Sequence, residues 1–174
     1  MNFMKLKYII LLVFTMGLFA SCDPNDTMDT PKTEFTGPGQ FLQGEWFVTY
    51  TDVNTGEIKD TNSKISTFNT AANDKNMMWV DDDKNYWGLK SVVNCDPETN
   101  TFSGEDLDEL YFGIKVNIKN GKVLPGAGTT AAGNVTDSIY MEIDYFDVKS
   151  DGTIQETNRI AAGVRRTGFL EDEY

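Results

Sequence analysis

The sequence predicts an all-β protein built around one antiparallel domain. Segments in which apolar and polar residues alternate recur about every ten residues, and clusters of Gly, Asn and Asp separate them. No window of about 11 residues carries the 3.6-residue period of an amphipathic helix, and only residues 105–110 could form a helical turn. Short strands at such regular spacing are typical of a sandwich or a barrel.

Four strands are predicted in the first half of this domain. Residues 46–50 alternate with period two, and residues 64–70 are rich in β-branched and aromatic side chains. The short apolar run 77–80 precedes an Asp-Asp-Lys-Asn turn at 82–85, and the apolar run 86–93 follows that turn. Two apolar runs on either side of a tight turn predict a hairpin.

The second half repeats this pattern with one strong turn signal. Residues 101–104 form a short strand, and residues 112–118 alternate with period two. The Asn120-Gly121 pair is the strongest hairpin signal in the chain, because both residues accept a positive φ. A return strand is therefore expected to begin at 122–124. The remaining expected elements are a loop of small residues at 126–133 and two strands at 139–145 and 156–166.

The N-terminus resembles the export signal of a bacterial lipoprotein. Two Lys residues precede an uncharged apolar run at 8–20, which is shorter than the run of about 20 residues that spans a bilayer. The small pair Ala20-Ser21 before Cys22 resembles the lipobox, in which the Cys thiol is acylated and the preceding peptide is removed. We therefore expect residues 1–21 to be a lipoprotein signal peptide and Cys22 to be the lipid-attachment site. The alternative is an ordinary signal peptide followed by a chance Cys.

The chain is expected to continue as a tether and then a single domain. Residues 22–40 are rich in Pro, Gly, Asp, Asn and Thr, and such a segment has too little apolar surface to order itself. Residues 41–174 form the predicted β-domain. This organisation implies an exported outer membrane lipoprotein on the periplasmic or cell-surface face, with the membrane as a partner through the N-terminal lipid.

The composition excludes several kinds of chemistry. Without residues 1–21 the net charge is about −14, which disfavours nucleic acid and anionic headgroups as partners. The chain has no His, which removes Ser-His-Asp and Cys-His catalysis and His-ligated zinc. If Cys22 carries lipid, Cys95 has no disulfide partner and is expected to be a small buried residue. We expect no cofactor and no bound metal.

Three acidic clusters remain to be explained. The three Asp residues at 81–83 could supply a calcium site, but they lack the Gly and the distant Glu of an EF-hand loop, so a solvated hairpin tip is favoured. The acidic residues at 171–173 are expected to form a frayed tail. The four carboxylates within 105–109 could serve a hydrolase, which needs no His, although nothing in the sequence places two of them across a cleft.

One motif favours a barrel over a sandwich. The opening strand Gly44-Glu45-Trp46 resembles the G-x-W motif of lipocalins and other calycins. In that group the Trp closes the base of the barrel, and a basic side chain from near the C-terminus packs across its ring, a contact worth about 0.5–2 kcal/mol. The resemblance implies that Trp46 closes the barrel with Arg165 or Arg166 over it. The alternative is an ordinary core Trp beside surface Arg residues.

A wider resemblance supports the same fold. Its motifs are G-E-W at 44–46, F-N-T-A-A-N-D at 68–74, M-W-V-D-D at 78–82 and R-R-T-G-F-L-E-D-E at 165–173. With these motifs nearly the whole mature chain resembles a family of Bacteroidetes lipoproteins described as lipid-binding putative hydrolases. The resemblance implies an all-β fold with a single antiparallel lipocalin-like (calycin) β-barrel of about eight strands. It supplies no catalytic residue.

The aromatic residues suggest a ligand wall. Trp79 and Met77 share one face of a predicted strand, and Trp87 and Leu89 share a face of the next. If those faces coincide, the four side chains form an apolar ligand site; the alternative is that they are simply core. The leading hypothesis is a barrel that holds a small apolar, lipid-like ligand. The alternatives are a non-enzymatic envelope domain whose surface binds a protein or glycan, and a carboxylate-dependent hydrolase.

Overall fold

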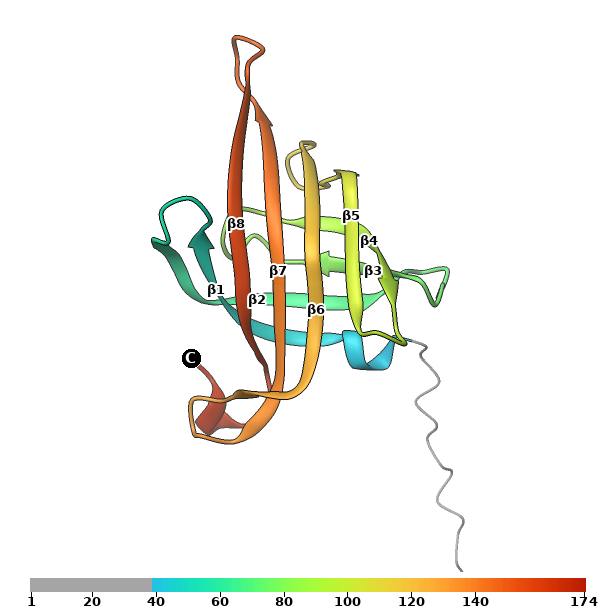
Figure 1. The fold of residues 1–174 in the computed structure, drawn as a ribbon, viewed down its shortest axis with the longest axis vertical. Coiled ribbons are helices and arrows are strands. Elements are labelled where there is room, and N and C mark those ends of the chain that lie inside the picture. The colour runs from blue at the N-terminus through green and yellow to red at the C-terminus, as the bar shows by residue number, and fades with distance from the viewer. Residues whose placement is uncertain (1–38) are drawn as a thin grey trace, which may run out of the picture. The chain divides into compact units, whose positions relative to one another are not determined.

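The computed structural model describes residues 39–174, which form a closed antiparallel β-barrel (Figure 1). Each strand pairs with the next in sequence, and β1 pairs with β8 to close the barrel. The all-β class and the eight-stranded antiparallel barrel predicted from the sequence are therefore confirmed. The elements are η1 (Gln40–Leu42), β1 (Gly44–Asp52), β2 (Ile58–Asn69), β3 (Met77–Asp81), β4 (Lys90–Asp96), β5 (Thr101–Asp108), β6 (Lys115–Thr129), β7 (Val135–Val148), β8 (Ile154–Arg165) and η2 (Leu170–Asp172).

The predicted signal peptide, Cys22 and nearly all of the predicted tether lie outside the described residues. The described chain begins at Gly39, immediately before the 3-10 helix η1. Within residues 39–174, no helix is long and apolar enough to cross a membrane.

The barrel interior follows from strict alternation along the strands. In β1, Trp46, Val48 and Tyr50 are buried and the residues between them are partly exposed, as expected when successive side chains point to opposite faces. β7 contributes Ile139, Met141 and further buried side chains to the same interior. The eight strands thus share one apolar core enclosed by the barrel wall.

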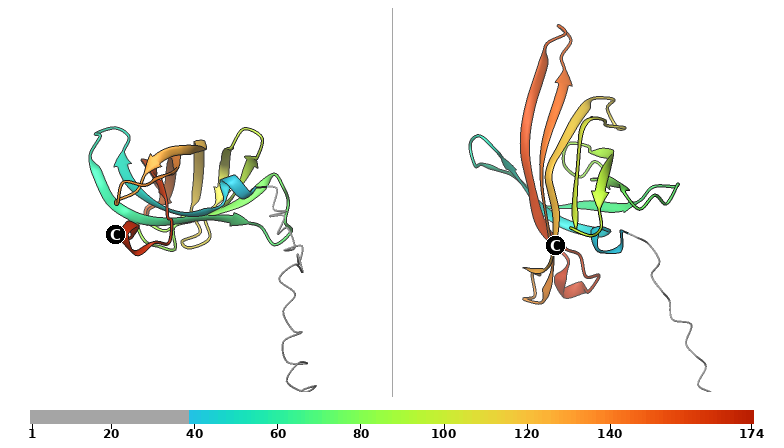
Figure 2. Two further views of the ribbon diagram at one scale, coloured as in Figure 1. Left: turned by 90° about the horizontal axis from the view of Figure 1, so that it is seen from below. Right: turned by 45° about the vertical axis from the view of Figure 1, so that its right-hand side comes forward.

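The two ends of the barrel differ. We call the end that carries η1 and the C-terminal segment the base, and the end formed by the connections 53–57, 82–89, 109–114 and 149–153 the mouth. The β7–β8 hairpin extends past the other connections at the mouth (Figures 1 and 2). Because β1 runs from the base to the mouth, Gly39 and the mouth lie at opposite ends of the barrel.

The predicted hairpin at Asn120-Gly121 is wrong, because β6 runs straight through this pair. β6 carries one extra residue here relative to both neighbouring strands. Lys119 and Lys122 pair with Glu142 and Tyr140 of β7, and Ile118 and Gly121 pair with Gly104 and Phe102 of β5. Asn120 has a φ of 52°. A positive φ suits a β-bulge as well as a tight turn, so the same residues that signal a hairpin here bend a continuous strand.

Two other local predictions also need correction. Residues 105–108 continue β5 and do not form a helical turn, and Asp106 occupies a second bulge with a φ of 52°. Residues 86–89 belong to a loop, so β4 begins only at Lys90. The side chain of Asp82 holds this loop, since it accepts the backbone N–H groups that a strand would use for pairing.

The acidic C-terminus is docked on the barrel and is not frayed. Asp172 is buried and accepts hydrogen bonds from the Thr167 hydroxyl (2.6 Å) and the Ala132 N–H (3.3 Å). Hydrogen bonds from Thr130 and Thr167 lower the pKa of Asp172 below its ordinary value. Glu173 forms an ion pair with Arg166 at 2.7 Å. The tail therefore forms part of the base.

Candidate functional site

Trp46 and Arg165 close the base. Trp46 is fully buried, its ring nitrogen donates to the Thr67 hydroxyl (2.9 Å), and the Arg165 guanidinium lies 4.2 Å from the centre of its ring. Arg165 also donates to the carbonyl of Phe41 (2.8 Å), which ties η1 to the last strand. Arg166 lies elsewhere, paired with Glu45 and Glu173. A ligand must therefore reach the barrel from another side.

The mouth carries an apolar pocket of about 210 Å³. Trp87, Phe112, Ile114 and Asp147 line it, so it brings together the 82–89 loop, the 109–114 loop and the end of β7. Trp87 is 37% exposed and Phe112 is 62% exposed. Large aromatic side chains that face solvent beside one carboxylate are typical of a site where an apolar group binds.

Asp82 fixes the loop that presents Trp87. Its carboxylate is fully buried and accepts the backbone N–H groups of Leu89 (2.7 Å), Lys84 (2.9 Å) and Gly88 (3.1 Å). Burial raises the pKa of Asp82 above its ordinary value, although these N–H groups oppose the change. The carboxylate satisfies donors that would otherwise be buried without partners, and so it holds Trp87 at the mouth.

Glu109 fixes the second loop in the same way. It is almost fully buried and accepts the N–H groups of Tyr111 (2.7 Å), Phe112 (2.8 Å) and Lys90 (3.2 Å). The Phe112 ring lies against Gly88, where an added Cβ would come within 2.4 Å of it. The two loops therefore pack on each other, and each is ordered by one buried acid.

Asp81 adds a third link between these loops. Its carboxylate pairs with Lys90 (2.5 Å) and accepts the Tyr111 hydroxyl (2.6 Å). Burial acts to raise the pKa of Asp81, but the hydrogen bonds from Lys90 and Tyr111 hold it below its ordinary value. The predicted solvated tip at 81–83 is therefore wrong for Asp81 and Asp82, because both carboxylates are buried and hold the mouth together.

Three tyrosines pack inside the barrel next to Trp87, and we call Tyr50, Tyr86 and Tyr145 the floor tyrosines. Trp87 contacts the fully buried Tyr145, with ring centres 4.8 Å apart. Tyr50 is also fully buried, and its ring stacks on that of Tyr86 at 4.2 Å. The Tyr86 hydroxyl accepts a hydrogen bond from Arg159 (2.9 Å). Polar hydroxyls thus lie inside the barrel below an apolar rim.

The structure does not bring the four predicted ligand residues together. Trp87 lines the mouth pocket, and Leu89 is fully buried in the core. Met77 and Trp79 point to the outside of the barrel, because Met78 and Val80 fill the interior positions of β3. Trp79 instead stacks on Phe68 and lines an outer depression that also includes Val92 and Leu110.

Sequence reasoning missed the other half of the pocket. The sequence pattern predicts a strand that contains Phe112 and Ile114 and another that ends at Tyr145, and it assigns none of the three to a ligand site. One sequence signal pointed to a loop here: in the segment Glu109-Leu-Tyr-Phe-Gly, large apolar residues follow an acid and precede a Gly. Such a segment fits a loop ordered by a carboxylate at least as well as a strand.

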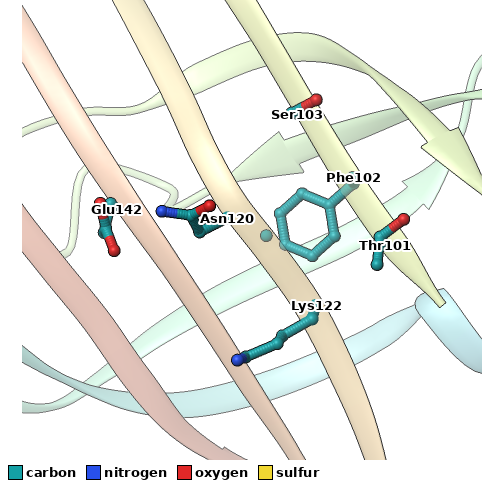
Figure 3. Close-up of a pocket in the computed structure, with 7 residues that line it drawn as sticks. Thr101, Phe102, Ser103, Asn120, Lys122 and Glu142 are labelled. Carbon is teal, nitrogen blue, oxygen red and sulfur yellow. The ribbon is translucent and has the colours of Figure 1, made fainter. Parts of the chain in front are cut away.

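A second pocket lies on the outer wall, around the β6 bulge. It has a volume of about 530 Å³, and Figure 3 shows the Phe102 ring beside Asn120 and Lys122 of β6, with Glu142 of β7 on the other side of β6. Thr101 and Ser103 add hydroxyl groups to the lining. This outer groove is more polar than the mouth and suits a polar partner better than an apolar chain.

The two buried acids of the mouth, Asp82 and Glu109, have structural roles. Asp82 and Glu109 each accept three backbone N–H groups, so neither carboxylate is free to act on a substrate in this arrangement. Within the part of the chain that the structure describes, no three His, Cys, Asp or Glu side chains are grouped so that they could hold a metal ion. The pocket lining itself consists of three apolar side chains, Trp87, Phe112 and Ile114, and one carboxylate, Asp147.

Comparison with known proteins agrees with this geometry. No curated protein matches the chain in sequence. Residues 32–170 match the family described as "lipid-binding putative hydrolase". The match covers most of the chain and almost all of the barrel, and this family together with the barrel fold supports lipid binding in general. The chain belongs to the lipid-binding putative hydrolase family.

Proposed function

We propose that this protein binds a small apolar, lipid-like ligand at the mouth of its barrel. The observation that carries the proposal is the pocket between Trp87, Phe112 and Ile114, held by two buried acids whose only evident role is to order its loops. Burying apolar area supplies roughly 25 cal/mol per Å², so binding here needs no chemistry. The pocket of about 210 Å³ is below the range of roughly 300–1,000 Å³ for drug-sized ligands, so it fits one acyl segment or one ring.

Trp87→Ala is expected to weaken binding of a neutral naphthalene probe, N-phenyl-1-naphthylamine, about tenfold, or about 1.4 kcal/mol. Trp87 is the largest side chain among those that line the pocket. The matched control is Trp79→Ala, which removes the same ring from the outer wall and should leave the affinity unchanged. A fluorescence titration measures both, with circular dichroism to verify the fold.

The probe affinity should change little between low salt and 1 M salt, because apolar burial is insensitive to screening, whereas surface charge contacts weaken as the Debye length falls to about 3 Å. Absence of saturable binding to the unaltered protein would remove the mouth as the site. The outer groove around the β6 bulge would then be the leading candidate.

We also propose that the protein is exported and anchored by lipid at Cys22, on the periplasmic or cell-surface side of the outer membrane. The apolar run at 8–20 and the Ala20-Ser21-Cys22 sequence support this proposal. The described chain starts at the base, so an anchor attached before Gly39 joins the barrel at the end opposite the mouth.

Cys22→Ala is expected to release the protein from membranes or to leave an uncut precursor, because the acceptor thiol is lost. Fractionation of cells followed by mass measurement of the N-terminal peptide tests this result. Cys95→Ala serves as the control, since the thiol of Cys95 is buried in the barrel and should not affect localisation. Membrane attachment of the Cys22→Ala protein equal to that of the unaltered protein would exclude the anchor.

A further inference from the structure

Two hydroxyl groups inside the barrel lack partners. Tyr50 and Tyr145 are both fully buried, and within the described residues neither hydroxyl oxygen has a hydrogen-bond partner. Buried polar groups in folded proteins are nearly always paired with protein, ordered water or a ligand. These two hydroxyls therefore mark a place where a polar atom from outside the protein is needed.

Tyr145 borders the mouth pocket through Trp87, whose ring lines the pocket and lies with its centre 4.8 Å from that of Tyr145. Tyr50 lies close enough to Tyr145 for the two phenols to affect each other's pKa. The third tyrosine of the floor, Tyr86, already accepts a hydrogen bond from Arg159. The unpaired groups are thus confined to Tyr50 and Tyr145 among the floor tyrosines that the structure describes.

The charges around the hydroxyls select the kind of atom that can bind. Burial raises the pKa of Tyr145, and the nearby carboxylates of Asp82 and Glu109 raise it further against the opposing effect of Arg159. Arg159 is committed to an ion pair with Asp52 at 2.7 Å. Because Tyr50 and Tyr145 are fully buried and Arg159 is already paired with Asp52, an anionic oxygen bound here would be buried without a free counter-charge, whereas an uncharged oxygen would not carry that cost.

We propose that the Tyr145 and Tyr50 hydroxyls donate hydrogen bonds to an uncharged oxygen of the ligand, such as the carbonyl of an acyl ester. The ligand enters with this oxygen first, and its apolar chain then lies against Trp87, Phe112 and Ile114. The Trp87 side chain must swing aside during entry. This assignment rests on the proposed function of the mouth and adds to it a preference for neutral acyl lipids over fatty-acid anions.

The test compares Tyr145→Phe with the unaltered protein. Bound N-phenyl-1-naphthylamine, which carries no oxygen, reports occupancy of the pocket, and methyl decanoate and decanoate compete for it. Tyr145→Phe should weaken displacement by methyl decanoate about five- to tenfold and should change the affinity of the probe itself less than twofold. Because the hydroxyl is unpaired in the free protein, Tyr145→Phe should unfold at no lower urea concentration than the unaltered protein.

The matched control is Tyr140→Phe, which removes a hydroxyl bonded to Glu142 on the outer wall and should leave both competitors unaffected. If methyl decanoate displaces the probe equally well from the Tyr145→Phe and the unaltered proteins, the assignment is overturned and the hydroxyls bind water instead. Strong displacement by decanoate that Tyr145→Phe abolishes would show that the hydroxyls hold an anion, which would also overturn it. Failure of the probe to bind the unaltered protein would instead contradict the proposed function itself.

Discussion

Trp46→Ala is expected to lower the free energy of unfolding by about 3–5 kcal/mol, as truncation of large core residues does. Trp46 is fully buried, and its loss would leave a cavity between the base and the core. The change also removes the donor to Thr67, whose hydroxyl in turn bonds the carbonyl of Leu42 at 2.6 Å. The Arg165 guanidinium would lose the ring on which it rests. Contacts of η1, β1, β2 and β8 thus depend on one side chain.

Urea unfolding followed by circular dichroism measures this effect. Trp79→Ala is the matched control, because the same residue type there lies half-buried on the outer wall against Phe68; it should cost clearly less. Arg165→Lys tests the second half of the contact, since Lys keeps the charge but loses the planar group that stacks on the indole. A loss below about 1 kcal/mol for Trp46→Ala would show that the base does not depend on this ring.

The fold could be predicted because local pattern and global packing agree. Alternation in β1 and β7 fixes which side chains face inward, and strands at regular spacing with turn signals between them indicate a sandwich or a barrel. The choice of a barrel came from the Gly44-Glu45-Trp46 motif and the family resemblance, and the motif also indicated the base. These features depend on residues close in sequence, which a linear reading can assess.

The bulge at Asn120-Gly121 shows where such reading fails. A positive φ at Asn120 suits either a two-residue turn or a bulge. The bulge forms and the turn does not, because β6 pairs with β5 on one side and with β7 on the other and so remains one strand. Gly121 has no room for a side chain, since a Cβ there would lie 2.4 Å from the Phe102 carbonyl oxygen. That crowding comes from the paired strand β5, which lies outside the few residues that a local turn signal takes into account.

For a similar reason only part of the candidate site could be predicted from the sequence. The run Met77-Met78-Trp79-Val80 is apolar throughout, so alternation cannot tell which pair faces the core. The acids Asp82 and Glu109 read as surface residues, because acidic residues are seldom fully buried. Their burial becomes favourable only when two loops supply several N–H groups to each carboxylate, which is a property of the folded mouth.

Glu109→Ala is expected to lower the free energy of unfolding by about 2–4 kcal/mol and to abolish probe binding at the mouth. The carboxylate accepts the N–H groups of Lys90, Tyr111 and Phe112, and each buried donor left without a partner costs about 1–3 kcal/mol. The expected loss of stability is smaller than three times this cost, because water that enters the opened loop can pair with the freed N–H groups. Since Phe112 is positioned by one of these bonds, its side of the pocket is lost together with the stability.

Two further variants separate the role of charge from that of the hydrogen bonds. Glu109→Gln keeps an oxygen for Lys90 and Tyr111 but places an NH₂ group opposite the Phe112 N–H, so it should disturb the pocket more than it lowers stability. Glu105→Ala removes an exposed acid from the same segment and should change stability by less than about 0.5 kcal/mol. Urea unfolding and the probe titration on all three proteins give the comparison. Normal probe affinity in a folded Glu109→Ala protein would mean that the core and the neighbouring loop, rather than the carboxylate, hold Phe112 at the mouth.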